Sequence, residues 1–585
     1  MARTVGIGIQ SFEKIIANKY LYIDKTDFIR EWWESGDDVT LITRPRRFGK
    51  TLNMDMMERF LSIEYAGRGE VFEGLSIWKD KKYRALQGTF PVIFLSFADV
   101  KAGTFALAKE KICMLIKNLY SRHDYILTGG TLKEGEPELF RAAFSTMPDS
   151  VISYSLKNLS GFLSRYYNQK VIILLDEYDT PLQEAWVNGY WQEMVEFIRG
   201  LFNSAFKTNP YLERAVMTGI TRVSKESVFS DLNNPEVVTT TSEKYEDCFG
   251  FTEEEVWEAL QECGLYENRA EVRDWYDGFC FGKRRDIYNP WSIINYLDKK
   301  RLAAYWANTS SNNLVDKLIR EGSPEIKISM EKLLQGEHLC KEIDEQIIFD
   351  QLGGDENAIW SLLLAGGYLK VENLTFNQDT GEELYELSLT NKEVQLMFRK
   401  MIKKWFAGSG TVYNGFIKAL LQGDVKAMNA YMNKVALETF SYFDSGKKPS
   451  AEAEPERFYH GFVLGLSMEL ADRYLIISNR ESGFGRYDVV IEARAGSVSG
   501  LAGQEKDVVL NCNAWWDAII MEFKVRDPGE EASLEETAQA ALQQIEKMQY
   551  AASLEARGIA GERIRKYGFA FEGKRVYIAE GTGGY

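Results

Sequence analysis

The first 235 residues alternate between short apolar runs and longer stretches with helical spacing. Four of the runs predict strands: Val39–Thr43, Pro91–Phe97, Val171–Leu175 and Arg214–Gly219. Strands rich in Val, Ile and Leu that are separated by helices are typical of a parallel sheet covered on both faces. We therefore predict an α/β domain over residues 1–235.

Beyond residue 235 the pattern becomes mainly helical. Thr252–Cys263 has a threonine, then acidic residues, then helical spacing, which predicts a capped helix. Asn289-Pro290-Trp291 predicts the start of another helix. A helix, a Gly-Gly turn and two strands follow over residues 357–389, an order compatible with a winged-helix unit. We expect a helical lid over 236–310, a possible winged-helix unit over 311–395, and a helical connector with a linker over 396–450.

Residues 451–585 return to an α/β pattern. The polar, glycine-containing stretch 494–506 predicts a flexible insertion between two strands. We expect these elements: a helix over 458–470, strands over 474–478, 487–492 and 518–524, a helix over 533–550 and a strand over 576–578.

The loop after the first strand carries the second half of a phosphate-binding motif. In the stretch LITRPRRFGKT, Gly49, Lys50 and Thr51 match the end of the P-loop pattern, whereas Arg44 stands where its first glycine is expected. Such a loop points backbone N–H groups at phosphate from a helix N-terminus. Lys50 would reach the β- and γ-phosphates of ATP, and Thr51 would bind Mg²⁺. The other candidate nucleotide-binding residues of the loop are Arg46, Arg47 and Phe48.

An apolar strand that ends in acids supplies the second half of this site. The stretch VIILLDEYD ends its apolar run at Asp176 and Glu177, which is the Walker B arrangement. Asp176 would hold Mg²⁺, and Glu177 would polarise the water that attacks the γ-phosphate. Alternatively, the two acids merely end a strand and cap a helix. Because both motifs occur in order, with Pro91–Phe97 between them as the additional-strand class of P-loop ATPases requires, we favour binding of ATP and Mg²⁺.

The fourth predicted strand ends in a polar turn. Thr218 could sense the γ-phosphate there, and Arg222 could stabilise charge in the transition state. An ordinary strand-end turn with a surface arginine explains the pattern equally well.

Two carboxylates and a lysine near the C-terminus indicate a second metal site. Glu522 and Lys524 are two residues apart in a predicted strand, so they face the same side, and Asp488 belongs to a neighbouring strand. Such a set can hold Mg²⁺, or Mn²⁺, and a water beside a phosphodiester. The long interval between the two acids is explained by the insertion 494–506. A cross-strand ion pair is the alternative interpretation, although the apolar neighbours argue against it.

These motifs resemble those of a known family. SFEKI, LYIDKT, RPRRFGKT, FLSFADVK, LLDEYDTPL, TGITRVSK and IYNPWSI are similar to the bacterial AAA-ATPase-like proteins that carry a C-terminal PD-(D/E)XK nuclease-superfamily domain. The resemblance covers nearly the whole chain, and the family shares the arginine-containing P-loop. It implies that Gln544, on the helix after the Glu-x-Lys strand, belongs to the second site. Either Glu469 or Glu481 would supply a further acid.

Together these features predict an α/β multidomain protein. An N-terminal P-loop ATPase of the additional-strand class is followed by the helical lid, the possible winged helix and a C-terminal PD-(D/E)XK nuclease-like α/β domain over 451–585. We expect an ATP-controlled, Mg²⁺-dependent DNA endonuclease that serves in defence or mobile-element control, the setting resting on analogy alone. The alternative is a nucleotide-switched signalling or binding protein with a degenerate nuclease-like domain.

Composition narrows the partners and the compartment. With 70 Lys and Arg against 86 Asp and Glu, the net charge is −16, so DNA must be bound by local basic patches, such as 283–285 or 563–566. Six scattered cysteines and three histidines argue against zinc and favour a reducing cytoplasm. Apolar runs are too short to span a membrane. The expected partners are ATP and DNA, and a homo-oligomer is possible.

Overall fold

The computed structural model divides the chain into two compact units, which are described separately. The first comprises residues 1–314 and 338–395, and the second comprises 315–337 and 396–585. The residues that the structure describes are 3–143, 147–222, 235–307, 313–344, 356–378, 381–405, 410–443, 465–466, 470, 474–482, 485–493, 518–527, 529, 531–572 and 575–581.

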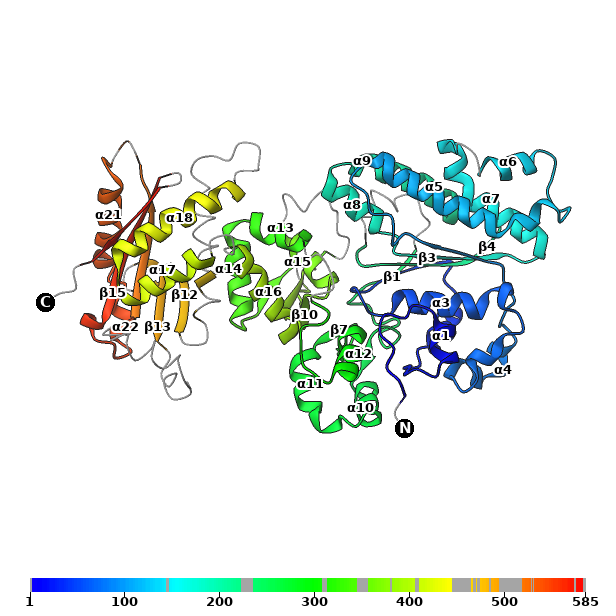
Figure 1. The fold of residues 1–585 in the computed structure, drawn as a ribbon, viewed down its shortest axis with the longest axis horizontal. Coiled ribbons are helices and arrows are strands. Elements are labelled where there is room, and N and C mark those ends of the chain that lie inside the picture. Colours follow the sequence, from blue (N-terminus) through cyan, green and yellow to red (C-terminus); the bar gives the residue numbers. More distant parts are fainter. Residues whose placement is uncertain are drawn as a thin grey trace. The chain divides into compact units, whose positions relative to one another are not determined.

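A parallel sheet forms the centre of the first unit, as predicted (Figure 1). Its strands are β1 (Val39–Thr43), β2 (Val92–Ser96), β3 (Val171–Asp176), β4 (Leu212–Gly219) and β5 (Glu236–Val238). They lie in the order β2-β3-β4-β1-β5. The strand inserted between the two motif strands β1 and β3 is therefore β4. The sequence analysis assigned the role of additional strand to Pro91–Phe97. That run forms β2, which lies at the edge of the sheet, so this prediction was wrong.

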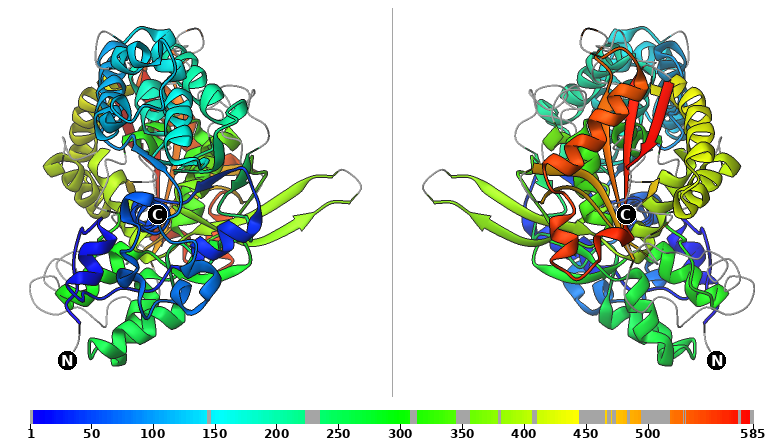
Figure 2. Two further views of the ribbon diagram at one scale, coloured as in Figure 1. Left: turned by 90° about the vertical axis from the view of Figure 1, so that its right-hand side faces the viewer. Right: turned by 90° about the vertical axis from the view of Figure 1, so that its left-hand side faces the viewer.

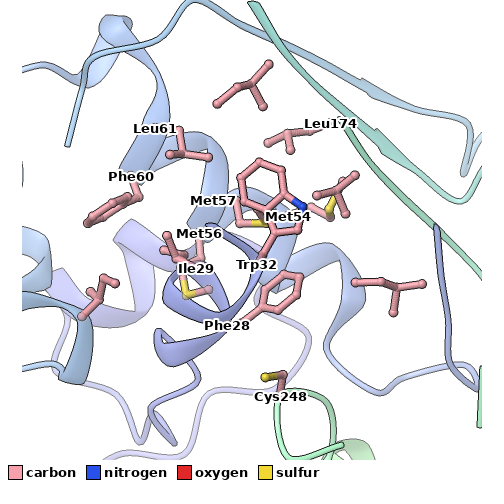
Figure 3. Packing of buried hydrophobic residues seen from close by; sticks show 14 of the residues in the cluster. Phe28, Ile29, Trp32, Met54, Met56, Met57, Phe60, Leu61, Leu174 and Cys248 are labelled. Atoms are coloured by element: carbon pink, nitrogen blue, oxygen red, sulfur yellow. The ribbon is translucent and has the colours of Figure 1, made fainter. Parts of the chain in front are cut away.

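Helices cover both faces of this sheet, and Figure 1 shows α5, α7 and α9 on one face and α1 and α3 on the other. Trp32, Met54 and Met57 pack close to Leu174 of β3 in the core on the α3 side (Figure 3). The helices are α1 (Phe12–Ala17), α2 (Asp27–Ser35), α3 (Lys50–Leu61), α4 (Lys81–Arg84), α5 (Phe105–Arg122), α6 (Glu136–Ala142), α7 (Asp149–Tyr167), α8 (Thr180–Asn188) and α9 (Trp191–Phe202).

The expected lid segment is built from short helices and a small antiparallel sheet. The sheet has the order β6-β8-β7. Thr252 caps its helix through a capping box with Glu255, and Asn289 caps another, as the sequence predicted. The elements are β6 (Phe251–Thr252), α10 (Glu253–Glu262), α11 (Arg269–Tyr276), β7 (Phe279–Phe281), β8 (Arg284–Tyr288) and α12 (Pro290–Lys299).

The predicted helix, turn and hairpin complete the first unit. The hairpin is a long two-stranded ribbon (Figure 2), and its strand order with a third, short strand is β10-β11-β9. The elements are β9 (Leu339–Lys341), α15 (Glu356–Ala365), β10 (Leu369–Phe376) and β11 (Glu383–Leu389). Assigning a lid and a winged helix to these segments stays a prediction.

A mixed five-stranded sheet forms the centre of the second unit. Its strands follow chain order, β12 to β16; β14 and β15 are parallel and the other neighbours antiparallel. The sequence analysis missed β15, because it treated 563–566 as a basic surface run. The elements are β12 (Tyr474–Ser482), β13 (Gly485–Ala493), β14 (Ala518–Val525), α21 (Leu534–Lys547), α22 (Ala552–Glu555), β15 (Ile564–Glu572) and β16 (Arg575–Glu580).

Side chains from preceding helices cover both edges of this sheet. Asn429 pairs with the backbone N–H and carbonyl of Ile578 in β16, both at 2.8 Å, and Asn433 pairs with Val576 in the same way. Gln335 donates to a carbonyl of β12 at 3.1 Å. Unpaired edge groups are thereby satisfied. The helices are α13 (Asn313–Glu321), α14 (Pro324–Leu334), α16 (Lys392–Trp405), α17 (Gly410–Gln422) and α18 (Val425–Phe443).

The two units do not follow the five expected segments one for one. Helix α14 comes from the expected winged-helix segment, and α17 and α18 come from the expected connector, yet all three belong to the unit of the C-terminal sheet. The predicted boundary near residue 450 and the insertion 494–506 lie outside the described residues. The five-segment division stays a prediction. Within the described ranges, no helix is both long and apolar enough to cross a bilayer.

Candidate nucleotide and metal sites

The loop after β1 closes around the side chain of Lys50. Gly49, with a φ of 83°, ends the loop and caps α3 in a left-handed conformation that favours glycine. The ammonium of Lys50 donates hydrogen bonds to the carbonyl oxygens of Arg44 and Pro45, both at 2.8 Å. Strand, turn and helix thus follow one another as a P-loop requires.

The other loop candidates divide into one buried ring and two exposed cations. Phe48 is buried, and its ring lies 4.8 Å from that of Phe279 and 5.2 Å from that of Phe281. Arg46 and Arg47 are exposed. Their side chains are therefore accessible to an anion that reaches the loop.

Burial makes the charge of Lys50 costly. It lowers the pKa of this lysine to about 8, although Glu177, Asp179 and Asp176 act in the opposite direction. A poorly solvated ammonium gains strongly from a nearby anion. The phosphates of a nucleotide are anions of the right kind for this position.

Asp176, at the end of β3, gathers hydroxyl groups from neighbouring strands and from α3. It accepts hydrogen bonds from Thr51 Oγ1 at 2.8 Å and from Thr218 Oγ1 at 2.5 Å. Burial raises the pKa of Asp176, which these hydrogen bonds oppose. The Thr51 hydroxyl and the Asp176 carboxylate are close enough to share one Mg²⁺, which prefers oxygen ligands.

The neighbouring candidates lie at the same ends of β3 and β4. Glu177 is partly exposed, has a φ of 53°, and accepts a hydrogen bond from Thr180 Oγ1 at 3.2 Å. Arg222 follows β4, and its Nε has no hydrogen-bond partner within the residues that the structure describes. The roles assigned to both residues stay predictions.

The sequence analysis gave no role to Asp179, although this residue ends the stretch VIILLDEYD. Its buried carboxylate accepts hydrogen bonds from Ile220 N and Thr221 N, both at 2.9 Å, and from Thr221 Oγ1 at 3.1 Å. A Cβ at Gly219 would meet Asp179 Oδ1 at 2.8 Å, so only glycine fits there. Asp179 therefore fixes the turn after β4.

The structural role of Arg44 was also missed, because the sequence shows only that this residue stands at the first glycine position of the P-loop pattern, as in the family that the chain resembles. Its side chain is fully buried and donates to the carbonyl oxygens of Thr239, of Lys244 at 3.4 Å and of Tyr245 at 3.5 Å. The guanidinium also lies 4.4 Å from the ring centroid of Phe281. Arg44 thus ties the loop to the segment after β5.

The second candidate site lies on neighbouring strands of the C-terminal sheet. Asp488 of β13 accepts a hydrogen bond from Phe523 N at 2.8 Å. Glu522 of β14 is buried, and Gln544 of α21 donates from Nε2 to its Oε1. The same amide donates to the Tyr550 hydroxyl at 3.2 Å, so Tyr550 is a further member that the sequence analysis missed. The structure brings these predicted residues together.

The electrostatics of this pair suit a divalent cation. Burial and the charge of Asp488 raise the pKa of Glu522 to about 8, while Lys524 and Gln544 lower it. The other carboxylate oxygen, Glu522 Oε2, is buried and has no hydrogen-bond partner among the described residues. An unsatisfied buried oxygen beside a second carboxylate fits Mg²⁺ or Mn²⁺.

The further acid of this site is not chosen by the structure. Glu469 lies outside the described residues, and Glu481 is a residue of β12 whose backbone pairs with Arg486. In the described part of the chain, no three His, Cys, Asp or Glu side chains group as metal ligands. Asp488 and Glu522 would therefore need other oxygen ligands.

Acids pair with each of the three cations of the first expected basic patch, 283–285, and with Lys566 of the second, 563–566. Such pairing at the surface leaves little net charge for a phosphate backbone. The distances between nitrogen and oxygen are 2.7 Å for Lys283–Glu243, 2.5 Å for Arg284–Glu254, 3.8 Å for Arg285–Glu372 and 2.7 Å for Lys566–Glu546.

Comparison with known proteins finds a matching family model near each end of the chain. Residues 6–229 match the model of the predicted AAA-ATPases, and residues 454–581 match the PD-(D/E)XK nuclease superfamily. An uncharacterised protein in the vnfD 5′ region of Azotobacter chroococcum mcd 1 is 27% identical over 322 residues, covering 54% of this chain and 56% of that protein. The chain thus spans little more than half of that relative. Domains of these two classes generally use a nucleotide and a divalent metal.

Restoring the standard glycine at position 44 should destabilise the protein. Arg44→Gly removes the donor to the carbonyl oxygens of Thr43, Thr239, Lys244 and Tyr245, so we expect it to lower the free energy of unfolding in urea by about 3 kcal/mol. Arg46→Ala, at an exposed neighbour, is the control and should change it by less than about 0.5 kcal/mol. Equal stability of wild type and Arg44→Gly would show that the guanidinium does not hold the loop.

Metal affinity at the second site should increase with pH. A metal binds the ionised carboxylate, so below the Glu522 pKa of about 8 it must displace a proton. Between pH 6 and 8 we expect the Mn²⁺ affinity measured by calorimetry to rise, approaching tenfold per pH unit. Glu522→Gln should remove this dependence, whereas Glu546→Gln, at an exposed acid of the same unit, should keep it. A pH-independent wild type would contradict the assignment.

Proposed function

Because this chain joins an AAA-ATPase-like domain to a PD-(D/E)XK nuclease-superfamily domain, we propose that it is an ATPase whose nucleotide state controls a metal-dependent DNA endonuclease. Cleavage of invading or mobile DNA is the setting that this pairing suggests. The observation that carries the proposal is the group formed by Lys50 and Thr51 at the start of α3 and Asp176 at the end of β3, of which Lys50 and Asp176 are buried.

In the nucleotide site each residue has one task. Lys50 leaves the carbonyls of its own loop and binds the β- and γ-phosphates of ATP. Thr51 and Asp176 hold Mg²⁺, which neutralises developing phosphate charge. Glu177 lies on the same strand end as Asp176 and orients the attacking water. The contact of Thr218 with Asp176 supports a role in placing the metal-binding carboxylate.

In the nuclease-like site the chain supplies two metal-binding acids and their supports. Asp488 and Glu522 would hold Mg²⁺ or Mn²⁺, which lowers the pKa of a bound water and stabilises charge on the scissile phosphate. Gln544 orients Glu522 by its hydrogen bond. Lys524, on the same strand as Glu522, stabilises the phosphodiester as negative charge develops.

Loss of the loop lysine should abolish nucleotide binding. Lys50→Ala removes the only ammonium that the loop holds at its centre, so we expect calorimetry with ATP and Mg²⁺ to show no binding while circular dichroism stays unchanged. Lys14→Ala, at an exposed lysine of the same domain, should bind as wild type does. Unchanged affinity of Lys50→Ala would remove the nucleotide-site assignment.

Nucleotide state should set the rate of DNA cleavage. Wild type should nick plasmid DNA with Mg²⁺ or Mn²⁺, and Lys524→Ala should not. Glu177→Gln keeps ATP bound but slows hydrolysis, so its cutting should persist longer if the ATP form is active and decline if that form is resting. Equal cutting by wild type, Glu177→Gln and Lys50→Ala at saturating ATP would contradict nucleotide control. Absence of metal-dependent cutting by wild type would instead favour a nucleotide-switched signalling or binding protein.

A further inference from the structure

The Asn-Pro-Trp motif at the start of α12 has no task in the function proposed above, yet it lies against the phosphate loop. Asn289 donates from Nδ2 to the carbonyl oxygen of Arg46 at 3.3 Å. Trp306 donates from its indole Nε1 to the same oxygen at 2.9 Å. The guanidinium of Arg47 lies 4.5 Å from the ring centroid of Trp291. Residues far along the chain therefore hold both loop arginines.

These two donors are themselves held rigidly. Asn289 Oδ1 accepts from the backbone N–H groups of Trp291 at 2.9 Å and Ser292 at 3.3 Å, which orients the amide so that Nδ2 faces Arg46. Asn289 and Trp306 are both buried. Because a buried donor that loses its acceptor costs free energy, both must follow any movement of the Arg46 carbonyl.

A buried carboxylate joins the two donor segments. Glu393 Oε1 accepts from Trp306 N at 2.6 Å, and Oε2 accepts from Ser292 Oγ at 2.8 Å. Glu393 lies in the first turn of α16, and the residues of that helix from Leu396 onward are counted with the second unit. An unbroken chain of hydrogen bonds thus runs from the nucleotide loop to the start of α16.

We propose that Asn289 and Trp306 are positioning residues for the nucleotide loop, and that Glu393 passes the state of the loop to α16. The inference rests on the proposed binding of ATP and names the residues through which that binding is sensed. When the phosphates draw Lys50 from the carbonyls of Arg44 and Pro45, the next carbonyl, that of Arg46, is repositioned with its two donors. The chain of hydrogen bonds then transmits this change to Glu393.

Two substitutions remove the donors, and the first also places a carboxylate oxygen against the Arg46 carbonyl. Asn289→Asp keeps the oxygen that caps α12 but loses the N–H groups, and Trp306→Phe keeps a ring against Phe279 and Tyr368 but loses the indole N–H. The double variant should bind ATP roughly ten- to thirtyfold more weakly, because two hydrogen bonds no longer preorganise the loop. Trp257→Phe removes an indole elsewhere in the same unit and should bind as wild type does.

Hydrogen exchange of the full-length protein with and without saturating ATP and Mg²⁺ tests the link to α16. In wild type and Trp257→Phe, ATP should change exchange at the amides of Trp306 and Ala307 and in the first turn of α16. The double variant should bind ATP without that change. Glu393→Gln, which keeps an acceptor for Trp306, should retain the change, and Glu393→Ala should lose it.

Three results would overturn the inference. One is ATP binding by wild type, shown by calorimetry, without altered exchange at these amides. Another is a double variant with wild-type affinity and the wild-type exchange change. The third is no ATP binding by wild type at all, which would overturn the proposed function together with the inference and is distinguished from the others by calorimetry alone.

Discussion

A buried ammonium at the end of the first strand is the constraint on which the first unit depends. The charge of Lys50 is removed from water, so it must be met by oxygen atoms that the fold supplies. The loop supplies two carbonyls, and the end of β3 supplies the acids Asp176, Glu177 and Asp179. Only a parallel sheet brings the carboxyl ends of β1 and β3 to one edge. The order of the strands and the chemistry of the site are therefore two aspects of one requirement.

The second unit has the opposite electrostatic problem, since the buried carboxylate of Glu522 lies near a second, partly buried carboxylate, that of Asp488. The pKa of Glu522 is raised, and Gln544 satisfies only one of its oxygens. A cation or a proton must reduce this repulsion. The strands that carry the two acids, β13 and β14, pair with each other and with β12 and β15, and asparagines of α18 pair with the edge strand β16. Helices distant in sequence thus support the sheet on which the acids lie.

Local sequence patterns predicted most of the helices and strands named in the sequence analysis. They could not predict contacts between residues that are far apart in the sequence. The apolar runs located β1, β3 and β4, and capping residues located α10 and α12. Strand β15 was missed because Arg565 and Lys566, two adjacent basic residues near its start, resemble a surface run. Arg44 was judged by its position in a motif, but its partners lie about two hundred residues later. Gln544 was identified only through the family resemblance, and nothing local indicated Tyr550.

The strength of a nucleotide switch is limited by the contacts that differ between its states. Two hydrogen bonds at the Arg46 carbonyl are worth about 2 kcal/mol together, which is a coupling of roughly thirtyfold. Reversing a population from 1:99 to 99:1 needs about 5.5 kcal/mol. These two hydrogen bonds alone therefore shift the balance between the two states without fully switching the protein. The backbone of Gly367 packs so closely on Pro45 that a Cβ there would lie 2.8 Å from the ring, and Arg44 holds the segment after β5. A complete switch requires that these loop contacts change together with the two hydrogen bonds at the Arg46 carbonyl, so that the loop moves as one body.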